Sequence, residues 1–139
     1  MFTGLRKRDD DMSEAKCRIL VVDDDPFVAE MLAVILDAEG YAVETAENGD
    51  DALVKFNAAP DTGLVISDMN MPGMTGLELF GAIRAANPGI ATILLTGSED
   101  VDLGQDADAY LLKDEDLQET ITLSVERVLE QRSLTGKSI

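Results

Sequence analysis

The stretch ILVVDDDP, residues 19–26, joins a short apolar run directly to three consecutive aspartates and a proline. A β-branched apolar run of this length predicts a buried strand. Asp23, Asp24 and Asp25 repel one another at close range unless a positive charge joins them. Pro26 is typical of the first turn of a helix. The stretch therefore predicts a strand that ends in a charged turn and leads straight into a helix.

The rest of the chain repeats this alternation of apolar strand and amphipathic helix. The strand runs are apolar throughout, which predicts a parallel sheet covered on both faces. Strands that alternate with helices indicate an α/β fold with right-handed crossovers. Strands are predicted at 18–22, 41–46, 62–68, 90–96 and 107–113, and helices at 26–40, 48–60, 75–89 and 116–132.

The domain organisation is predicted to be simple. The chain has 139 residues, which suits one domain with a single core. Residues 1–16 mix charge blocks without periodicity and predict a flexible N-terminal arm. Residues 17–132 form the folded body, and residues 133–139 are predicted to be a C-terminal tail.

Composition excludes several classes of function. The formal net charge of −17 argues against binding to nucleic acid or an anionic membrane. The chain has no histidine, which excludes histidine general bases, Ser-His-Asp triads and most zinc sites. The single cysteine, Cys17, allows no internal disulfide, and no apolar run approaches the ~18–20 residues that span a bilayer. We therefore expect a cytoplasmic protein.

Polar residues follow four of the predicted strands. In open parallel sheets, functional sites form beyond the carboxyl ends of the strands. The first strand leads to Asp23 and Asp24, the third to Asp68, the fourth to Thr96 and the fifth to Lys113. Clustered carboxylates fit Mg²⁺, which binds a few carboxylates and keeps several waters. A carboxylate can attack phosphorus to form an acyl phosphate, while metal and lysine neutralise the charge of the transferred group.

The individual acids are predicted to differ in role. Asp68 best fits the nucleophile because it stands alone at its strand end, before the loop DMNMPGMTG. The backbone carbonyl of Asn70 is a candidate metal ligand. Asp25 precedes Pro26, which favours extended backbone, and so suits a helix N-cap whose carboxylate accepts backbone N–H groups. Two aspartates are thus expected to hold a metal, and the third to start a helix.

The motifs ILVVDDDP, LVISDMNMPGMTG, ILLTG and AYLLK, in this order and spacing, resemble the receiver domain of two-component response regulators. The resemblance covers about residues 17–132 and implies a flavodoxin-like (βα)5 fold with strand order 2-1-3-4-5. It implies phosphoryl transfer from a sensor histidine kinase or histidine phosphotransfer protein. It also implies that phosphorylation changes a surface to which a downstream protein target binds. Such a domain catalyses only its own phosphorylation and dephosphorylation.

The resemblance also implies residue roles. Asp68 corresponds to the phosphoacceptor. Asp24 corresponds to a direct ligand of Mg²⁺, with Asp23 acting largely through water. Thr96 corresponds to the switch hydroxyl that turns toward the phosphoryl group, and Tyr110 to the aromatic residue whose rotamer couples to it.

The sequence departs from the family pattern in two places. Lys113 corresponds to the phosphate-pairing lysine, but Asp114 follows it where the family usually has a proline after a cis peptide bond. Because a non-proline cis bond costs ~3 kcal/mol, we expect a trans bond here. The segment between Thr96 and Lys113 is also shorter than is usual in the family, so the fourth helix is predicted to be missing or vestigial.

Two other functions compete with the phosphoacceptor interpretation. A phosphohydrolase of the haloacid dehalogenase type needs a second acid two residues after its nucleophile, and Asn70 occupies that position. A receiver-like binding module that signals without phosphate is favoured by the altered region 97–114. The joint presence of the acids, Thr96 and Lys113 argues against that module.

Overall fold

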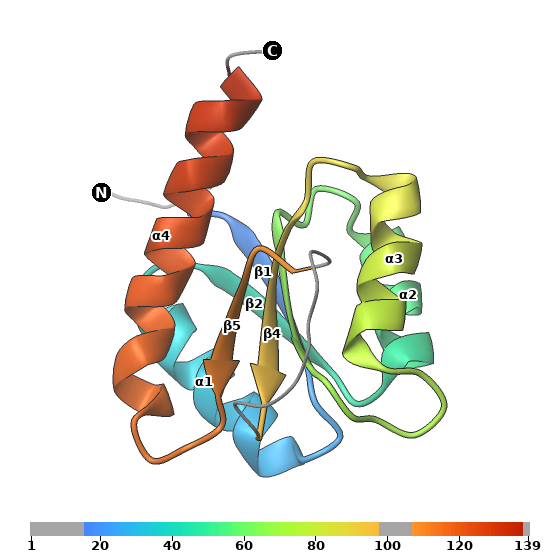
Figure 1. Cartoon of the computed structure of the whole chain (residues 1–139), viewed down its shortest axis with the longest axis vertical. Helices are drawn as coiled ribbons and strands as arrows, with labels where there is room; N and C mark the ends of the chain where they lie inside the picture. The colour runs from blue at the N-terminus through green and yellow to red at the C-terminus, as the bar shows by residue number, and fades with distance from the viewer. Residues whose placement is uncertain (1–15, 98–106, 138–139) are drawn as a thin grey trace, which may run out of the picture.

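The computed structural model describes residues 16–97 and 107–137, the last five of these by backbone alone. Five parallel strands form one sheet in the order β2-β1-β3-β4-β5, as predicted (Figure 1). Each strand begins within two residues of its predicted start and ends within one of its predicted end. The strands are β1 Arg18–Val22, β2 Ala42–Ala46, β3 Leu64–Asp68, β4 Ala91–Thr96 and β5 Ala109–Leu112.

Four helices are described, and they cover both faces of the sheet. α1 and α4 pack on one face, while α2 and α3 pack on the other (Figure 1). Every residue of β3 and β4 is buried, which agrees with a central sheet between two helical layers. The helices are α1 Pro26–Ala38, α2 Gly49–Ala58, α3 Gly76–Ala86 and α4 Leu117–Lys137.

The helix starts follow from short polar signals in the sequence. Asn48 caps α2, where its side-chain oxygen accepts the N–H of Asp51 at 2.7 Å. Thr75 and Glu78 form a reciprocal capping box at the start of α3, with N–O distances of 2.9 and 3.1 Å. Such caps satisfy N–H groups that the first turn of a helix leaves without partners.

The last helix is longer than predicted. α4 continues to Lys137, through most of the segment 133–139 that was predicted to be a tail. The apolar stripe that marked the helix stops at Leu129, but propagation of a formed helix adds one hydrogen bond per residue without further apolar contacts. The flexible arm predicted over 1–16 lies outside the described residues, except for Lys16.

The fourth helix of the family pattern would lie between β4 and β5. Residues 98–106 of that connection are outside the described residues, so the prediction that this helix is missing or vestigial stays a prediction. Among the described residues, no helix combines the length and the apolar character needed to cross a membrane.

Candidate functional site

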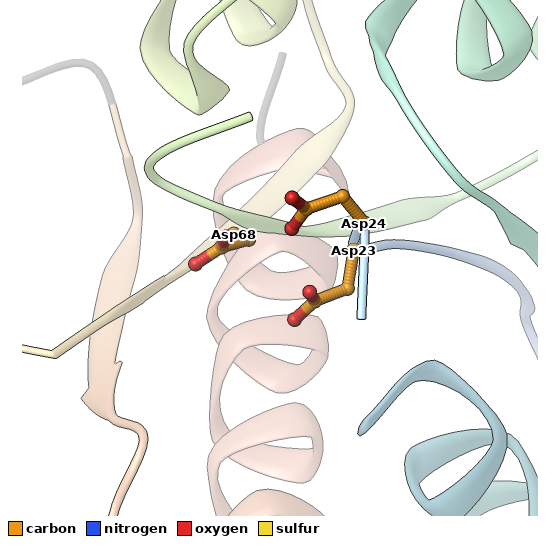
Figure 2. A group of neighbouring side chains, drawn as sticks. All are labelled: Asp23, Asp24 and Asp68. Carbon is orange, nitrogen blue, oxygen red and sulfur yellow. The ribbon is translucent and has the colours of Figure 1, made fainter. Parts of the chain in front are cut away.

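Three carboxylates meet where β1 and β3 end. β1 and β3 are parallel neighbours with Val22 opposite Ser67, so the residues that follow, Asp23 and Asp68, lie level with each other. Together with Asp24 they offer carboxylate oxygens that all lie within 4.8 Å of one another (Figure 2). Asp23 and Asp68 are buried, while Asp24 is exposed. The strand ends therefore bring the three predicted acids together.

Lys113 reaches this cluster from the end of β5. Its Nζ atom lies 2.9 Å from Oδ2 of Asp23 and 3.3 Å from Oδ1 of Asp68. Its backbone N–H donates to the carbonyl of Thr96 at 2.8 Å. The described residues include no cis peptide bond, which confirms the trans bond expected before Asp114. Lysine thus reaches the acids without the usual cis proline.

The electrostatics of the site are dominated by its negative charge. Burial raises the pKa of Asp68, and the charge of Asp23 raises it further, while Lys113 lowers it only in part. Burial alone would lower the pKa of Lys113, but its hydrogen bond to Asp23 and the charges of both acids outweigh burial and raise it. Lys113 is therefore held in its charged form, and the cluster keeps an excess of negative charge that another cation would relieve.

The three consecutive aspartates differ in their surroundings. Asp23 is engaged through both oxygens, because Oδ1 accepts the N–H of Asp25 at 2.9 Å and Oδ2 contacts Lys113. Asp25 caps α1 and accepts the N–H of Phe27 at 3.0 Å, which confirms its predicted role as an N-cap. Asp24 remains the exposed carboxylate of the cluster.

The donor set fits a magnesium ion. Oxygen ligands bound at 2.0–2.1 Å to one octahedral Mg²⁺ lie about 3 Å apart when adjacent and about 4 Å apart when opposite. The carboxylate oxygens, which lie within 4.8 Å of one another, could therefore share an ion if their side chains closed around it. Asp24 and Asp68 are the carboxylates best placed for direct ligation, since Asp23 already has a partner on each oxygen.

The remaining predicted site residues differ in exposure. Thr96 ends β4 and is buried. Asn70 is exposed in the loop that follows Asp68. Tyr110 is 52% exposed and lies opposite Leu94 in the β4–β5 pairing. Their predicted roles as switch residues and as a backbone ligand stay predictions.

Gly76 is a residue of the site that sequence reasoning missed. A Cβ atom at this position would lie 2.5 Å from the backbone oxygen of Asp68 and 2.7 Å from Cδ1 of Leu94. Its N–H donates to the carbonyl of Met69 at 2.9 Å. Glycine thus lets the start of α3 approach the end of β3 closely. The sequence offered one indication of this close approach, which is the glycine at the start of the predicted helix. Glycine in a helix lowers stability through its conformational freedom, so its presence there indicates a need for space.

A protein-family model described as the response regulator receiver domain matches residues 19–124. The chain belongs to this family. The match includes each aspartate of the cluster and Lys113, and it agrees with the strand order of the sheet. As a receiver domain, the protein is a signalling module of two-component systems.

Curated relatives of this receiver domain are longer regulators. It is 42% identical over 85 residues to transcriptional regulatory protein GlrR of Escherichia coli K12, a match that covers 61% of this chain and 19% of GlrR. It is 37% identical over 108 residues to the DNA-binding response regulator MtrA of Mycolicibacterium smegmatis, covering 73% of this chain and 46% of MtrA. The chain thus spans less than half the length of these relatives.

A solved relative carries ligands related to the candidate site. The response regulator protein TrrA of Thermotoga maritima, crystallised in complex with Mg(2+)-BeF, is 41% identical with a TM-score of 0.73. The match covers 81% of this chain and 99% of TrrA. This receiver domain therefore shares its fold with a response regulator whose structure contains magnesium and a beryllium fluoride group.

Proposed function

We propose that this receiver domain accepts a phosphoryl group on Asp68 in a Mg²⁺-dependent reaction. The donor is a phosphohistidine of a sensor histidine kinase or a histidine phosphotransfer protein. The observation that carries the proposal is the convergence of Asp23, Asp24 and Lys113 on the Asp68 carboxylate. The magnesium complex of TrrA supports the choice of metal.

The transfer requires an oxygen of Asp68 to attack the phosphorus of the donor. The phosphorus–nitrogen bond to the donor imidazole breaks as the phosphorus–oxygen bond to Asp68 forms, which leaves an acyl phosphate. Bound Mg²⁺ supplies neutralising charge for the oxygens of the transferred group. Lys113 supplies a second positive charge, and Asp23 holds its ammonium in place at 2.9 Å.

The supporting residues have distinct proposed roles. Asp24 ligates the metal directly, and Asp23 acts on it largely through water. The backbone carbonyl of Asn70 completes the protein ligands. Thr96 is the hydroxyl that turns toward the phosphoryl group, and Tyr110 follows that turn by a change of rotamer. These movements would alter a surface that a downstream protein recognises.

The proposed partners are proteins. The net charge of −17 supports a protein target over nucleic acid or a membrane for this domain, in a cytoplasmic setting. MtrA is a DNA-binding regulator, and the match covers 46% of its length. Apart from catalysing its own phosphorylation and dephosphorylation, the domain is proposed to act by binding.

Intact mass spectrometry tests the proposal. The protein is incubated with Mg²⁺ and acetyl phosphate, and we expect a gain of one phosphoryl group that is absent in Asp68→Asn. Asp25→Asn is the matched control, because asparagine caps a helix as well as aspartate and the metal cluster is untouched. If the wild-type protein gains no phosphoryl group and binds no beryllium fluoride, the domain signals without phosphate and the proposal is wrong.

A further inference from the structure

A second charged cluster lies at the start of β5, the opposite end of this strand from Lys113. We name it the Asp108 node, and it consists of Arg84, Thr92, Asp108 and Arg132. One carboxylate oxygen, Oδ2 of Asp108, accepts the N–H of Thr92 at 2.9 Å and contacts both arginines. This convergence of elements is outside the motifs that carry the family resemblance.

The node extends the β4–β5 hydrogen-bond ladder beyond the strand itself. The pairing begins with Ile93 opposite Ala109, so Thr92 and Asp108 would form the preceding pair. The N–H of Asp108 donates to the carbonyl of Thr92 at 3.1 Å, and the Asp108 side chain accepts the N–H of Thr92 in return. Because Thr92 is fully buried, loss of this acceptor would leave its N–H without a partner.

The node also joins the two helical layers. Arg84 comes from α3, and its Nη2 atom lies 3.3 Å from Oδ2 of Asp108. Arg132 comes from α4 on the other face, and its Nε donates to the same oxygen at 3.2 Å. The Nη2 of Arg132 also donates to the carbonyl of Ile90 at 2.9 Å, just before β4. The start of β5 is thus tied to β4 and to a helix on each face.

Burial alone specifies the register of β5 weakly. β5 lies at the edge of the sheet, and none of its four residues is buried, whereas all six residues of β4 are. A slip of one residue turns every side chain of a strand to the opposite face, and burial normally prevents it. For this strand, the hydrogen bonds and ion pairs of Asp108 add to the partial burial of Ala109 and Leu111 against the core.

We propose that the Asp108 node positions Lys113 at the phosphorylation site by fixing the register of β5. The ladder that starts at Thr92 ends where the N–H of Lys113 donates to Thr96 at 2.8 Å. Lys113 reaches Asp68 only while this register holds. Asp108 is therefore a positioning residue that acts through Lys113, and the effect on phosphoryl binding rests on the proposed function.

Hydrogen exchange of the metal-free protein tests the register independently of phosphate. In Asp108→Ala we expect faster amide exchange along β4–β5, including the N–H of Lys113, while exchange in the β1–β2 pair is unchanged. Asp108→Asn keeps an oxygen acceptor for Thr92 and should give an intermediate effect. Asp61→Ala, which removes the exposed ion pair between Asp61 and Arg18, is the control. Unchanged protection of Lys113 in Asp108→Ala would overturn the proposal.

A double-mutant cycle on beryllium fluoride affinity tests the link to Lys113. Asp108→Ala should weaken binding by about 3- to 10-fold, the range expected for coupling between connected residues. In a Lys113→Ala background, the same change should have no further effect, because the residue it positions is gone. Equal losses in both backgrounds would show a general structural role and contradict the proposal.

The two measurements separate the possible failures. If the wild-type protein binds no beryllium fluoride, the proposed phosphoacceptor function fails, while hydrogen exchange still decides whether the node holds β5. If Asp108→Ala does not fold, Arg132→Met removes one tie and leaves the Thr92 hydrogen bonds in place. Arg132→Met should show smaller increases in amide exchange at Lys113 and smaller losses of beryllium fluoride affinity. Wild-type exchange at Lys113 together with wild-type affinity would contradict the proposed role of the Asp108 node.

Discussion

The two ends of the sheet hold charged clusters of different composition. At the carboxyl end, the carboxylates of Asp23, Asp24 and Asp68 lie together, and Lys113 pairs with Asp23 and Asp68. At the amino end of β5, one carboxylate, Asp108, is shared by two arginines. Both clusters join segments that are far apart in the chain, but acids predominate among the described residues of the first and arginines among those of the second.

This difference separates a site suited to chemistry from one suited to structure. Burial raises the pKa of Asp68, and the negative charge of Asp23 raises it further. The surplus negative charge favours the entry of a cation. At the Asp108 node two arginines meet the carboxylate of Asp108, and the groups bond to backbone as well as to one another. Such an arrangement holds elements together without needing a ligand.

Removing the lysine of the carboxyl end should have the largest effect. Lys113→Met is expected to slow phosphorylation by acetyl phosphate about 10²-fold, because the ammonium group that stabilises charge on the transferred phosphoryl group is lost. The same change should tighten Mg²⁺ binding, since one competing positive charge leaves the cluster. Stopped-flow kinetics measures the phosphorylation rate, and titration with Mg²⁺ measures the metal affinity. A variant that phosphorylates at the wild-type rate would show that Lys113 is only a structural partner of Asp23.

Close packing beneath the carboxyl end gives the next largest effect. Gly76→Ala should lower the free energy of unfolding by about 1–3 kcal/mol, because its Cβ would press on the backbone of Asp68. Gly81, in the same helix, is the matched control, since a Cβ there meets nothing within 4 Å. Gly81→Ala should raise stability by roughly 0.5–1 kcal/mol. Urea unfolding of both variants measures the difference, and equal effects would contradict the close approach at Gly76.

The sequence predicted the carboxyl end of the sheet better than the amino end. β1 matched its predicted bounds because apolar strand runs are local patterns, and parallel strands place the residues that follow them at one edge. The members of the Asp108 node are spread from Arg84 to Arg132, with no local pattern that joins them. Their contact depends on helix packing around the sheet edge. The same rule predicted that Lys113 lies near the acids, but not that its partner would be Asp23, 90 residues away in the chain.

The metal ligands of the carboxyl end can be separated within the aspartate triplet. Asp24→Ala should weaken Mg²⁺ binding about tenfold, which corresponds to about 1.4 kcal/mol. Asp25→Asn should leave Mg²⁺ binding nearly unchanged, because Asp25 caps α1 and asparagine can replace it as a cap. Isothermal titration of both variants measures the two affinities. Equal losses would mean that the roles assigned within the triplet are wrong.

Neutralising one aspartate at each end should change stability in opposite directions. The pKa of Asp68 is raised in the folded protein, chiefly by burial and by the charge of Asp23. The folded state therefore binds this proton more tightly than the unfolded state. The resulting stabilisation is fully present below the unfolded pKa and is lost as the pH rises through the folded pKa. At neutral pH and without metal, ionised Asp68 thus destabilises the fold.

Asp68→Asn should accordingly raise the melting temperature of the metal-free protein by a few degrees at neutral pH. The difference from wild type should shrink as the pH falls and Asp68 becomes protonated. Added Mg²⁺ should also reduce it, because the ion stabilises wild type more than the variant. Asp108→Asn should instead lower the melting temperature, because two arginines lose their shared carboxylate. Thermal unfolding of both variants and wild type at several pH values, with and without Mg²⁺, measures these melting temperatures. A shift of the same sign in both variants would contradict the contrast between the two ends of the sheet.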